Sequence, residues 1–290
     1  MGMLEGKVAL VTGAGGGLGR AHAHLLASEG ASVVVNDLGG ARDGTGADSS
    51  MADGVVDEIK AAGGNAVAHY GSVTDKEAAR AMVDTAVQEF GKLDILIANA
   101  GILRDKSFKN MDDEMWDIVL DVHLRGTYLT SKAAFDRMLE QGDGGRIIMT
   151  SSTSGLLGNF GQTNYGAAKA GIAGFMRCLW LEGVKYGVTV NILAPTAMSR
   201  LTEDIFPEAM QDQFPPETVS PAVVWLCTDE AKEVSGRQWL VAGNSVQLLS
   251  WQLTPIANRD LADGPWDVAE IGERILASKE TWPPINPLRI

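Results

Sequence analysis

The sequence predicts an α/β fold in a single domain, with a doubly wound parallel sheet of about seven strands and helices on both faces. Three observations predict it. Short apolar runs alternate with longer segments of helical periodicity, and this alternation requires crossover connections between parallel strands. A glycine-rich turn follows the first apolar run directly. The chain has 290 residues, 45% of them hydrophobic, which is enough for one large core.

The first strand, turn and helix together suit a phosphate group. The strand is Lys7 to Thr12, and the helix runs from Arg20 to Glu29 before Gly30, a typical helix end. Glycines let the backbone approach a pyrophosphate, and the helix start offers free N–H groups and a positive dipole. These flanks favour a Rossmann-type dinucleotide site over a flexible turn. The predicted contacts in the turn are Gly13, Gly17, Leu18 and Gly19.

The second strand, Ser32 to Asp37, ends in an acid that bears on the choice of cofactor. Asp37 stands eighteen residues after Gly19. A carboxylate at this place accepts hydrogen bonds from the adenosine ribose and repels a 2′-phosphate, which favours NAD over NADP. Arg42, in the glycine-rich loop 38–54, could offset that preference, so NADP stays open. The loop either folds over the adenine end of the cofactor or is a disordered surface insertion.

The rest of the chain continues the alternation. We expect helices at 53–62, 75–90, 112–139, 163–185 and 219–228, and strands at 65–70, 93–99, 146–150, 188–193 and 238–241. In a doubly wound sheet, ligands bind at the carboxyl ends of the strands. The domain should span 1–245, with a C-terminal extension at 246–290. Further cofactor contacts are predicted at strand ends: Ser72, Val73, Asn99, Ala100, Gly101, Pro195 and Thr196.

Tyr165 and Lys169 are the candidate catalytic pair. They lie four residues apart in a helical segment, so their side chains stand on one face. An ammonium group beside a phenol favours phenolate, so Lys169 should lower the pKa of Tyr165 and make it a general acid/base. Ser152, thirteen residues earlier at a strand end, could hydrogen-bond the same substrate oxygen. Alone, the spacing also fits an ordinary surface helix, but the upstream glycine turn favours a catalytic role.

Composition excludes several other classes of function. The chain carries 24 basic and 37 acidic residues, a net charge of −13, which opposes binding to nucleic acid or an anionic membrane. Its two cysteines, Cys178 and Cys227, have no metal-binding or redox spacing, so no metal is expected. No apolar run is long enough to span a bilayer, and no signal-like segment opens the chain. We therefore expect an unprocessed cytoplasmic protein.

The motifs, taken in order, resemble the short-chain dehydrogenase/reductase family over about residues 5–245. They are Thr12-Gly13-x-x-x-Gly17-x-Gly19, Asn99-Ala100-Gly101, Ser152 and Tyr165-x-x-x-Lys169. The resemblance implies that Tyr165 is the acid/base, that Ser152 orients the substrate oxygen, and that Lys169 binds the nicotinamide ribose. It also implies dimers or tetramers formed through the helices at 112–139 and 163–185. His123 stands where the family often has a relay asparagine, so it is either a relay group or a packed helix histidine.

Longer runs resemble a narrower group, the (3R)-hydroxyacyl-CoA dehydrogenases of peroxisomal multifunctional enzyme type 2, also described as 17β-hydroxysteroid dehydrogenases. The runs are 35–40, 100–105, 122–126, 158–162 and 194–200, and His123 fits this group. The resemblance implies NAD-dependent oxidation of a (3R)-3-hydroxyacyl-CoA in fatty-acid or steroid side-chain β-oxidation. The alternatives are a 17β-hydroxysteroid dehydrogenase and, from another class, an NAD-sensing or scaffold protein without turnover.

Three further segments carry expectations of their own. Residues 200–216 should form an apolar flap over the acyl group, or else a plain surface connection. Arg104, Lys106 and Lys109 form a basic cluster that could meet CoA phosphates. The extension 246–290 holds three tryptophans, which are costly to leave in water, so it should pack on its own or a neighbouring subunit.

Overall fold

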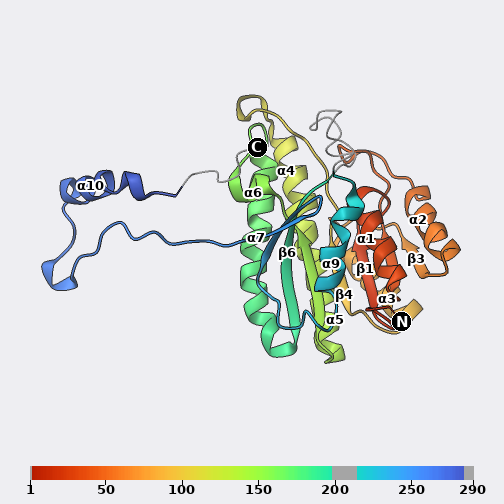
Figure 1. The fold of residues 1–290 in the computed structure, drawn as a ribbon. Coiled ribbons are helices and arrows are strands. Elements are labelled where there is room, and N and C mark those ends of the chain that lie inside the picture. Colours follow the sequence, from red (N-terminus) through yellow and green to blue (C-terminus); the bar gives the residue numbers. More distant parts are fainter. Residues whose placement is uncertain (1, 198–213, 284–290) are drawn as a thin grey trace. The chain divides into compact units, whose positions relative to one another are not determined.

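The computed structural model describes residues 2–197 and 214–283 (Figure 1). The chain divides into two compact units, Met1–Leu249 and Ser250–Ile290. The first unit contains the whole sheet and its helices. The second contains short helical segments only, within its described part.

An eight-stranded sheet forms the centre of the first unit. Its strand order is β3-β2-β1-β4-β5-β6-β7-β8, and all pairs are parallel except β7 with β8. This arrangement confirms the predicted doubly wound fold. The strands are β1 Val8–Thr12, β2 Ser32–Asn36, β3 Asn65–His69, β4 Ile95–Ala98, β5 Gly145–Thr150, β6 Val188–Thr196, β7 Gln238–Ala242 and β8 Ser245–Leu249.

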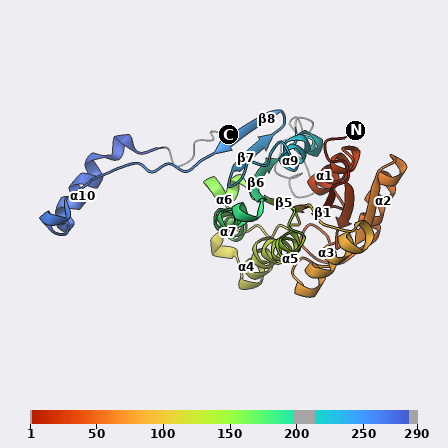
Figure 2. The ribbon, with the colours of Figure 1, turned by 90° about the horizontal axis from the view of Figure 1, so that it is seen from below.

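The central strands are apolar because helices cover both faces of the sheet. Every residue of β1 and of β4 is buried, as expected for parallel strands between two helical layers. Figure 2 shows α1 and α9 on one side of the sheet and α3, α5 and α7 on the other. The helices are α1 Gly17–Ser28, α2 Ser50–Ala61, α3 Lys76–Phe90, α4 Asp113–Leu120, α5 Gly126–Gln141, α6 Thr153–Leu157, α7 Thr163–Gly183, α9 Ser220–Leu226 and α10 Val268–Ala277.

A π-helical turn, Asp121–Arg125, joins α4 to α5 and interrupts the single helix expected at 112–139. π-Helical turns of this kind widen a helix locally and are frequent at functional sites. His123 lies in this turn and is buried. The turn therefore brings a polar ring into the interior, toward the end of β4.

The sequence missed two elements of the first unit. β8 follows β7 through the two-residue turn Gly243-Asn244, in which Gly243 has φ of +53°. A Gly-Asn pair between two apolar runs is typical of a β-hairpin. The predicted sheet ended at residue 241 and so omitted this hairpin. The short helix α6 lies between Ser152 and α7, in a segment for which no element was predicted.

The loop after β2 is folded and tied to the rest of the unit. Within it, the N–H of Asp48 donates to the carbonyl of Leu38 at 3.1 Å. At its tip, the N–H of Leu103 donates to the carbonyl of Arg42 at 3.1 Å. Of the two alternatives for this loop, these bonds favour a folded loop over the cofactor site rather than a disordered insertion. Helix α2 begins at Ser50, three residues before the predicted start.

The second unit, described as far as residue 283, contains α10, Val268–Ala277. Asp267 caps the helix by accepting from the N–H of Ala269 at 2.8 Å. The guanidinium of Arg259 donates to Glu270 at 2.8 Å and lies 5.0 Å from the Trp266 ring. Several large apolar side chains are exposed here, among them Trp251, Leu253, Leu261 and Val268.

Candidate active site

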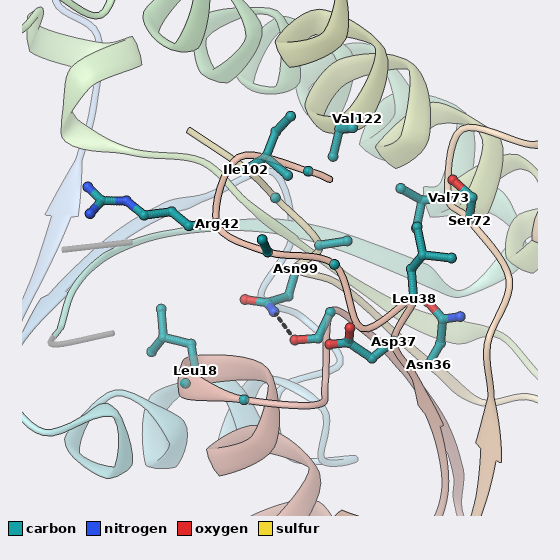
Figure 3. Close-up of a pocket in the computed structure, with 18 of the residues that line it drawn as sticks. Leu18, Asn36, Asp37, Leu38, Arg42, Ser72, Val73, Asn99, Ile102 and Val122 are labelled. Carbon is teal, nitrogen blue, oxygen red and sulfur yellow. Dashed lines mark hydrogen bonds between the residues drawn. The ribbon is translucent and has the colours of Figure 1, made fainter. Parts of the chain in front are cut away.

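A pocket opens where the strand order reverses, between β1 and β4 (Figure 3). A crevice at this switch point is the usual ligand site of a doubly wound sheet. Most of the predicted cofactor contacts line the pocket: Gly13, Gly17, Leu18, Asp37, Ser72, Val73, Asn99, Ala100 and Gly101.

The glycine turn packs too closely against the neighbouring backbone to allow side chains at two of its glycines. A Cβ atom on Gly13 would lie 2.7 Å from the Cα of Ala100, and Gly13 has φ of +65°. A Cβ atom on Gly19 would lie 2.1 Å from the carbonyl oxygen of Gly13. No side chain caps the start of α1, and its first turn has no acidic residue. The turn therefore presents free N–H groups at a helix start, which fits the pyrophosphate of a dinucleotide.

Asp37 lies at the end of β2 and faces the same pocket. Its two carboxylate oxygens accept the N–H groups of Gly15 and Gly39, each at 2.7 Å. Each oxygen keeps a second lone pair, so the carboxylate can still accept a ribose hydroxyl. Arg42 also lines the pocket, and Figure 3 shows its side chain pointing away from Asp37.

Asn99 and Thr12 join the ends of β4 and β1. The Thr12 hydroxyl accepts the N–H groups of Asn99 and Ala100, at 3.0 and 3.2 Å. The Asn99 amide donates to the carbonyls of Thr12 and Gly13, both at 3.1 Å, and Figure 3 marks the bond to Gly13. Asn99 thus holds the glycine turn in shape from the neighbouring strand.

Ser152, which lies between β5 and α6, stands close to Tyr165 and Lys169 of α7. The Ser152 hydroxyl hydrogen-bonds Tyr165 and caps α6 by accepting the N–H of Ser154 at 3.1 Å. The Lys169 ammonium lies 5.4 Å from the centre of the Tyr165 ring and donates to the carbonyl of Thr150 at 2.6 Å. The i and i+4 spacing on α7 therefore brings the phenol and the amine side by side, as predicted.

The expected lowering of the Tyr165 pKa is wrong for this structure. Burial raises the pKa of Tyr165 to about 12, the hydrogen bond from Ser152 opposes that rise, and the Asp105 carboxylate adds to it. Burial also lowers the pKa of Lys169 to about 7, because only 3% of this residue is exposed. The simple pair argument failed because it ignored the loss of water around both groups.

His123 lies against Tyr165 without bonding its hydroxyl. The two rings meet edge to face with centres 5.0 Å apart. Nε2 of His123 lies 3.1 Å from the N–H nitrogen and 2.8 Å from the carbonyl oxygen of Ile102, and buried Nδ1 has no partner. Burial first, and then the charge of Lys169, hold the His123 pKa well below its usual value, so the ring is neutral. A Cβ atom on Gly101 would lie 2.4 Å from this ring.

Five predicted cofactor residues do not line the pocket. Tyr165 and Lys169 belong to the catalytic cluster. Gly19 lies in α1, directly against the backbone of Gly13, and Pro195 and Thr196 lie at the end of β6. The pocket also contains residues that sequence reasoning did not select as contacts, half of them from the loop after β2. They are Gly16, Asn36, Leu38, Gly40, Ala41, Arg42, Gly44, Gly71, Ile102 and Val122.

The predicted basic cluster, Arg104, Lys106 and Lys109, contains one residue with a structural contact and two exposed residues. Nε of Arg104 donates to the carbonyl of Asp43 at 2.7 Å, so this side chain fastens the loop after β2. Lys106 and Lys109 are exposed. The predicted flap, 200–216, lies mostly outside the described residues. Among the residues that are described, no group of three or more His, Cys, Asp or Glu side chains could hold a metal ion.

The combination of a nucleotide crevice with a neighbouring cluster of Ser152, Tyr165 and Lys169 defines a dinucleotide-dependent oxidoreductase. Residues 7–207 match the family described as short chain dehydrogenase. The chain therefore belongs to the short-chain dehydrogenase/reductase family, whose members act on alcohol groups, and the alternative of a protein without turnover is set aside.

Relatives in other organisms agree with this assignment. A Mycobacterium tuberculosis protein, named only as a short-chain type dehydrogenase/reductase, is 50% identical over 92% of each chain. Hydroxyacyl-CoA dehydrogenase ChsB1 of the same organism is 41% identical over 92% of this chain and 87% of its own. Mouse peroxisomal multifunctional enzyme type 2 is 50% identical over 86% of this chain, which spans 33% of that enzyme. The resemblance to this enzyme is thereby confirmed.

Solved structures share the fold. A short chain dehydrogenase from Mycobacterium avium superposes with a TM-score of 0.87 at 43% identity, and both chains are covered completely. A short chain dehydrogenase from Mycobacterium paratuberculosis bound to NAD gives a TM-score of 0.77 at 30% identity, over 83% of this chain and 98% of that one.

Proposed function

We propose that this protein oxidises the C3 hydroxyl of a (3R)-3-hydroxyacyl-CoA to the 3-oxoacyl-CoA, with NAD as the cofactor. The observation that carries the proposal is the cluster of Ser152, Tyr165 and Lys169 beside the nucleotide pocket. The likeness to a hydroxyacyl-CoA dehydrogenase over most of both chains supports the choice of substrate.

In this proposal Tyr165 acts in its phenolate form, which is the minor form at neutral pH because burial raises its pKa to about 12. The phenolate takes the hydroxyl proton and becomes the phenol while the C3 hydride leaves. When bound, NAD⁺ supplies the hydride acceptor. Ser152, hydrogen-bonded to Tyr165, donates to the substrate oxygen and fixes its position. Lys169 keeps its amine against the phenol ring and can receive or return a proton near neutral pH, because its pKa is about 7.

We propose that His123 is a packed residue that positions the Tyr165 ring, rather than a proton relay. Its neutral ring contacts Tyr165 edge-on and pairs with the backbone of Ile102. These contacts support a positioning role for the phenol ring. A relay role would use Nδ1, the buried nitrogen without a partner.

The preference for NAD rests on Asp37. Its carboxylate lines the pocket, where a 2′-phosphate would meet a negative charge. Arg42, which could have offset this charge, extends away from Asp37 and acts instead on the Asp105 carboxyl. Burial raises the pKa of Asp105, and the hydrogen bond from Gln162 and then the charge of Arg42 oppose that rise. Both observations favour NAD over NADP.

Kinetics on a matched panel test the substrate. NAD⁺ reduction is followed with 3-hydroxyacyl-CoA esters of both configurations and with free 17β-hydroxysteroids. The proposal expects the (3R) esters to give a kcat/KM at least about 100-fold above that of the steroids and of the (3S) esters. A steroid that equals or exceeds the esters would replace the proposal with the 17β-hydroxysteroid alternative.

Two further expectations belong to the proposal. The protein is expected to form a dimer or tetramer, and the extension from residue 246 is expected to pack on its own or a neighbouring subunit. Its exposed apolar side chains support that expectation. No helix in the described ranges is long and apolar enough to cross a membrane. The cytoplasmic location remains a prediction.

A further inference from the structure

Gln162 is a buried amide that joins three walls of the candidate active site. It precedes Tyr165 by three residues, at the start of α7, and only 6% of it is exposed. Its Nε2 donates to the Asp105 carboxylate at 2.6 Å. Its Oε1 accepts from the hydroxyl of Ser154 at 2.7 Å and from the amide of Asn159 at 3.0 Å. The amide therefore links the loop after β4, the helix α6 and the start of α7.

Asp105 fixes which way the Gln162 amide faces. An ionised carboxylate can only accept hydrogen bonds, so Nε2 must point at Asp105 and Oε1 must point at Ser154. The Ser154 hydroxyl must then donate to Gln162. The charged acceptor makes the bond to Asp105 the stronger one in this set.

The same set of bonds ends at the catalytic serine. Ser154, held by Gln162 through its hydroxyl, donates its backbone N–H to the Ser152 hydroxyl oxygen at 3.1 Å. Because that oxygen already accepts from the backbone, the Ser152 hydrogen is left to point at Tyr165 or at a substrate oxygen. Through these bonds, Asp105 and Gln162 help to set the direction in which the Ser152 hydroxyl donates.

Few charged groups face this network. The Arg42 guanidinium acts on Asp105 from the loop after β2, and the Asp105 charge acts on the Tyr165 phenol from the other side. Lys106 meets the Gln162 segment through its backbone, whose N–H donates to the carbonyl of Gly161 at 3.0 Å. The titration of an acid introduced at position 162 would therefore be controlled mainly by Asp105 and Arg42.

We propose that Gln162, oriented by Asp105, is a positioning residue that directs the Ser152 hydroxyl toward the reacting oxygen. The inference rests on the proposed proton transfer at Tyr165 and Ser152, but not on the identity of the alcohol. It can be tested with any alcohol that the wild-type enzyme oxidises.

Gln162→Glu is the informative variant. At about pH 8 the introduced carboxylate faces Asp105 with a like charge and no hydrogen to donate, so kcat should fall about 10- to 100-fold. At about pH 5.5 the two carboxyls share a proton, which restores the donor toward Asp105. The ratio of variant to wild-type kcat should therefore rise at least about 5-fold as the pH falls between these values. A ratio that stays constant with pH would overturn the proposal.

A double variant distinguishes an effect of the side-chain orientation at position 162 from an effect of its packing. In Asp105→Asn/Gln162→Glu the new amide can donate to the introduced carboxylate, so kcat should return to within about 5-fold of wild type and the abnormal pH dependence should vanish. Continued loss at all pH values would contradict the proposal. Dinucleotide affinity, measured by fluorescence titration, should stay within about 3-fold of wild type in both variants, because neither residue lines the nucleotide pocket.

Ser154→Ala provides an independent arm if Gln162→Glu does not fold. It removes the hydroxyl that Gln162 holds but keeps the N–H that bonds Ser152. We expect kcat to fall about 10-fold with KM nearly unchanged, since the loss is in orientation of the reacting groups. An unchanged kcat would show that Gln162 does not direct Ser152. Were the wild-type enzyme to oxidise no alcohol, the proposed function would fail before this inference was reached.

Discussion

The burial of Lys169 makes a direct prediction about stability and pH. Its usual pKa of 10.5 falls to about 7 in the folded protein because the ammonium loses its water. The unfolded chain therefore binds more protons than the folded protein between these two values. Stability must rise with pH across this window, and the penalty for burying the ammonium grows as the pH falls toward 7. Lys169→Met removes the titrating group and keeps a side chain of similar length.

The size of the effect follows from the two pKa values. Each pH unit contributes up to about 1.4 kcal/mol when one state holds the proton and the other has lost it. At pH 7 the folded group is half protonated, so the rise from pH 7 to pH 9 amounts to about 2 kcal/mol. Loss of the donor to the Thr150 carbonyl costs the variant about 1 kcal/mol, equally at both pH values.

Urea unfolding at pH 7 and pH 9, followed by tryptophan fluorescence, measures this difference. All other titrating groups are shared, so the wild type should gain about 2 kcal/mol more than Lys169→Met between the two pH values. Equal pH dependence in the two proteins would refute the argument that Lys169 is buried with a lowered pKa. Protein concentration is held constant, because assembly would also shift the midpoint.

The other predictions concern the cofactor, the turn, the proton and the extension. Asp37→Ala should lower kcat/KM for NAD by about 10-fold and raise the relative use of NADP, which side-by-side kinetics with both cofactors will measure. Gly19→Ala places a Cβ atom 2.1 Å from the Gly13 carbonyl, so dinucleotide binding should be lost in fluorescence titration; retained affinity would contradict the predicted fit. Because burial raises the pKa of Tyr165 to about 12, the phenol is protonated at neutral pH, so oxidation should quicken and ketone reduction should slow as pH rises; matched pH profiles in the two directions check the sign. Removal of the chain after Leu249 should lower the number of subunits found by light scattering or reduce activity, and a truncated protein unchanged in both would contradict the proposal for the extension.

The alternating pattern was enough to predict the sheet and its helices. It worked because buried parallel strands are apolar throughout, so β1, β4 and β5 stand out against the helical segments. It failed at β8, whose residues are mostly exposed and therefore lack that signal. The π-helical turn around His123 also has no periodic signature, because it changes the helix by one residue only.

The site was predicted less completely than the fold. Motif spacing identified the glycine turn, Asp37 and the Ser152, Tyr165 and Lys169 cluster, because each depends on local backbone geometry. Electrostatics could not be read in the same way. The pKa values of Tyr165 and Lys169 depend on how far the surrounding chain excludes water, which only the packed structure reveals. Gln162 was part of a matching run, but its partner Asp105 lies 57 residues away.

Turnover by Tyr165→Phe tests the central claim most directly. The change removes only the phenol oxygen, so the ring contact with His123 and the nucleotide pocket should remain. We predict that kcat for alcohol oxidation falls at least about 1,000-fold while NAD affinity in fluorescence titration changes less than about 3-fold. Oxidation within about 10-fold of wild type, with the cofactor bound normally, would contradict the assignment of Tyr165 as the proton acceptor.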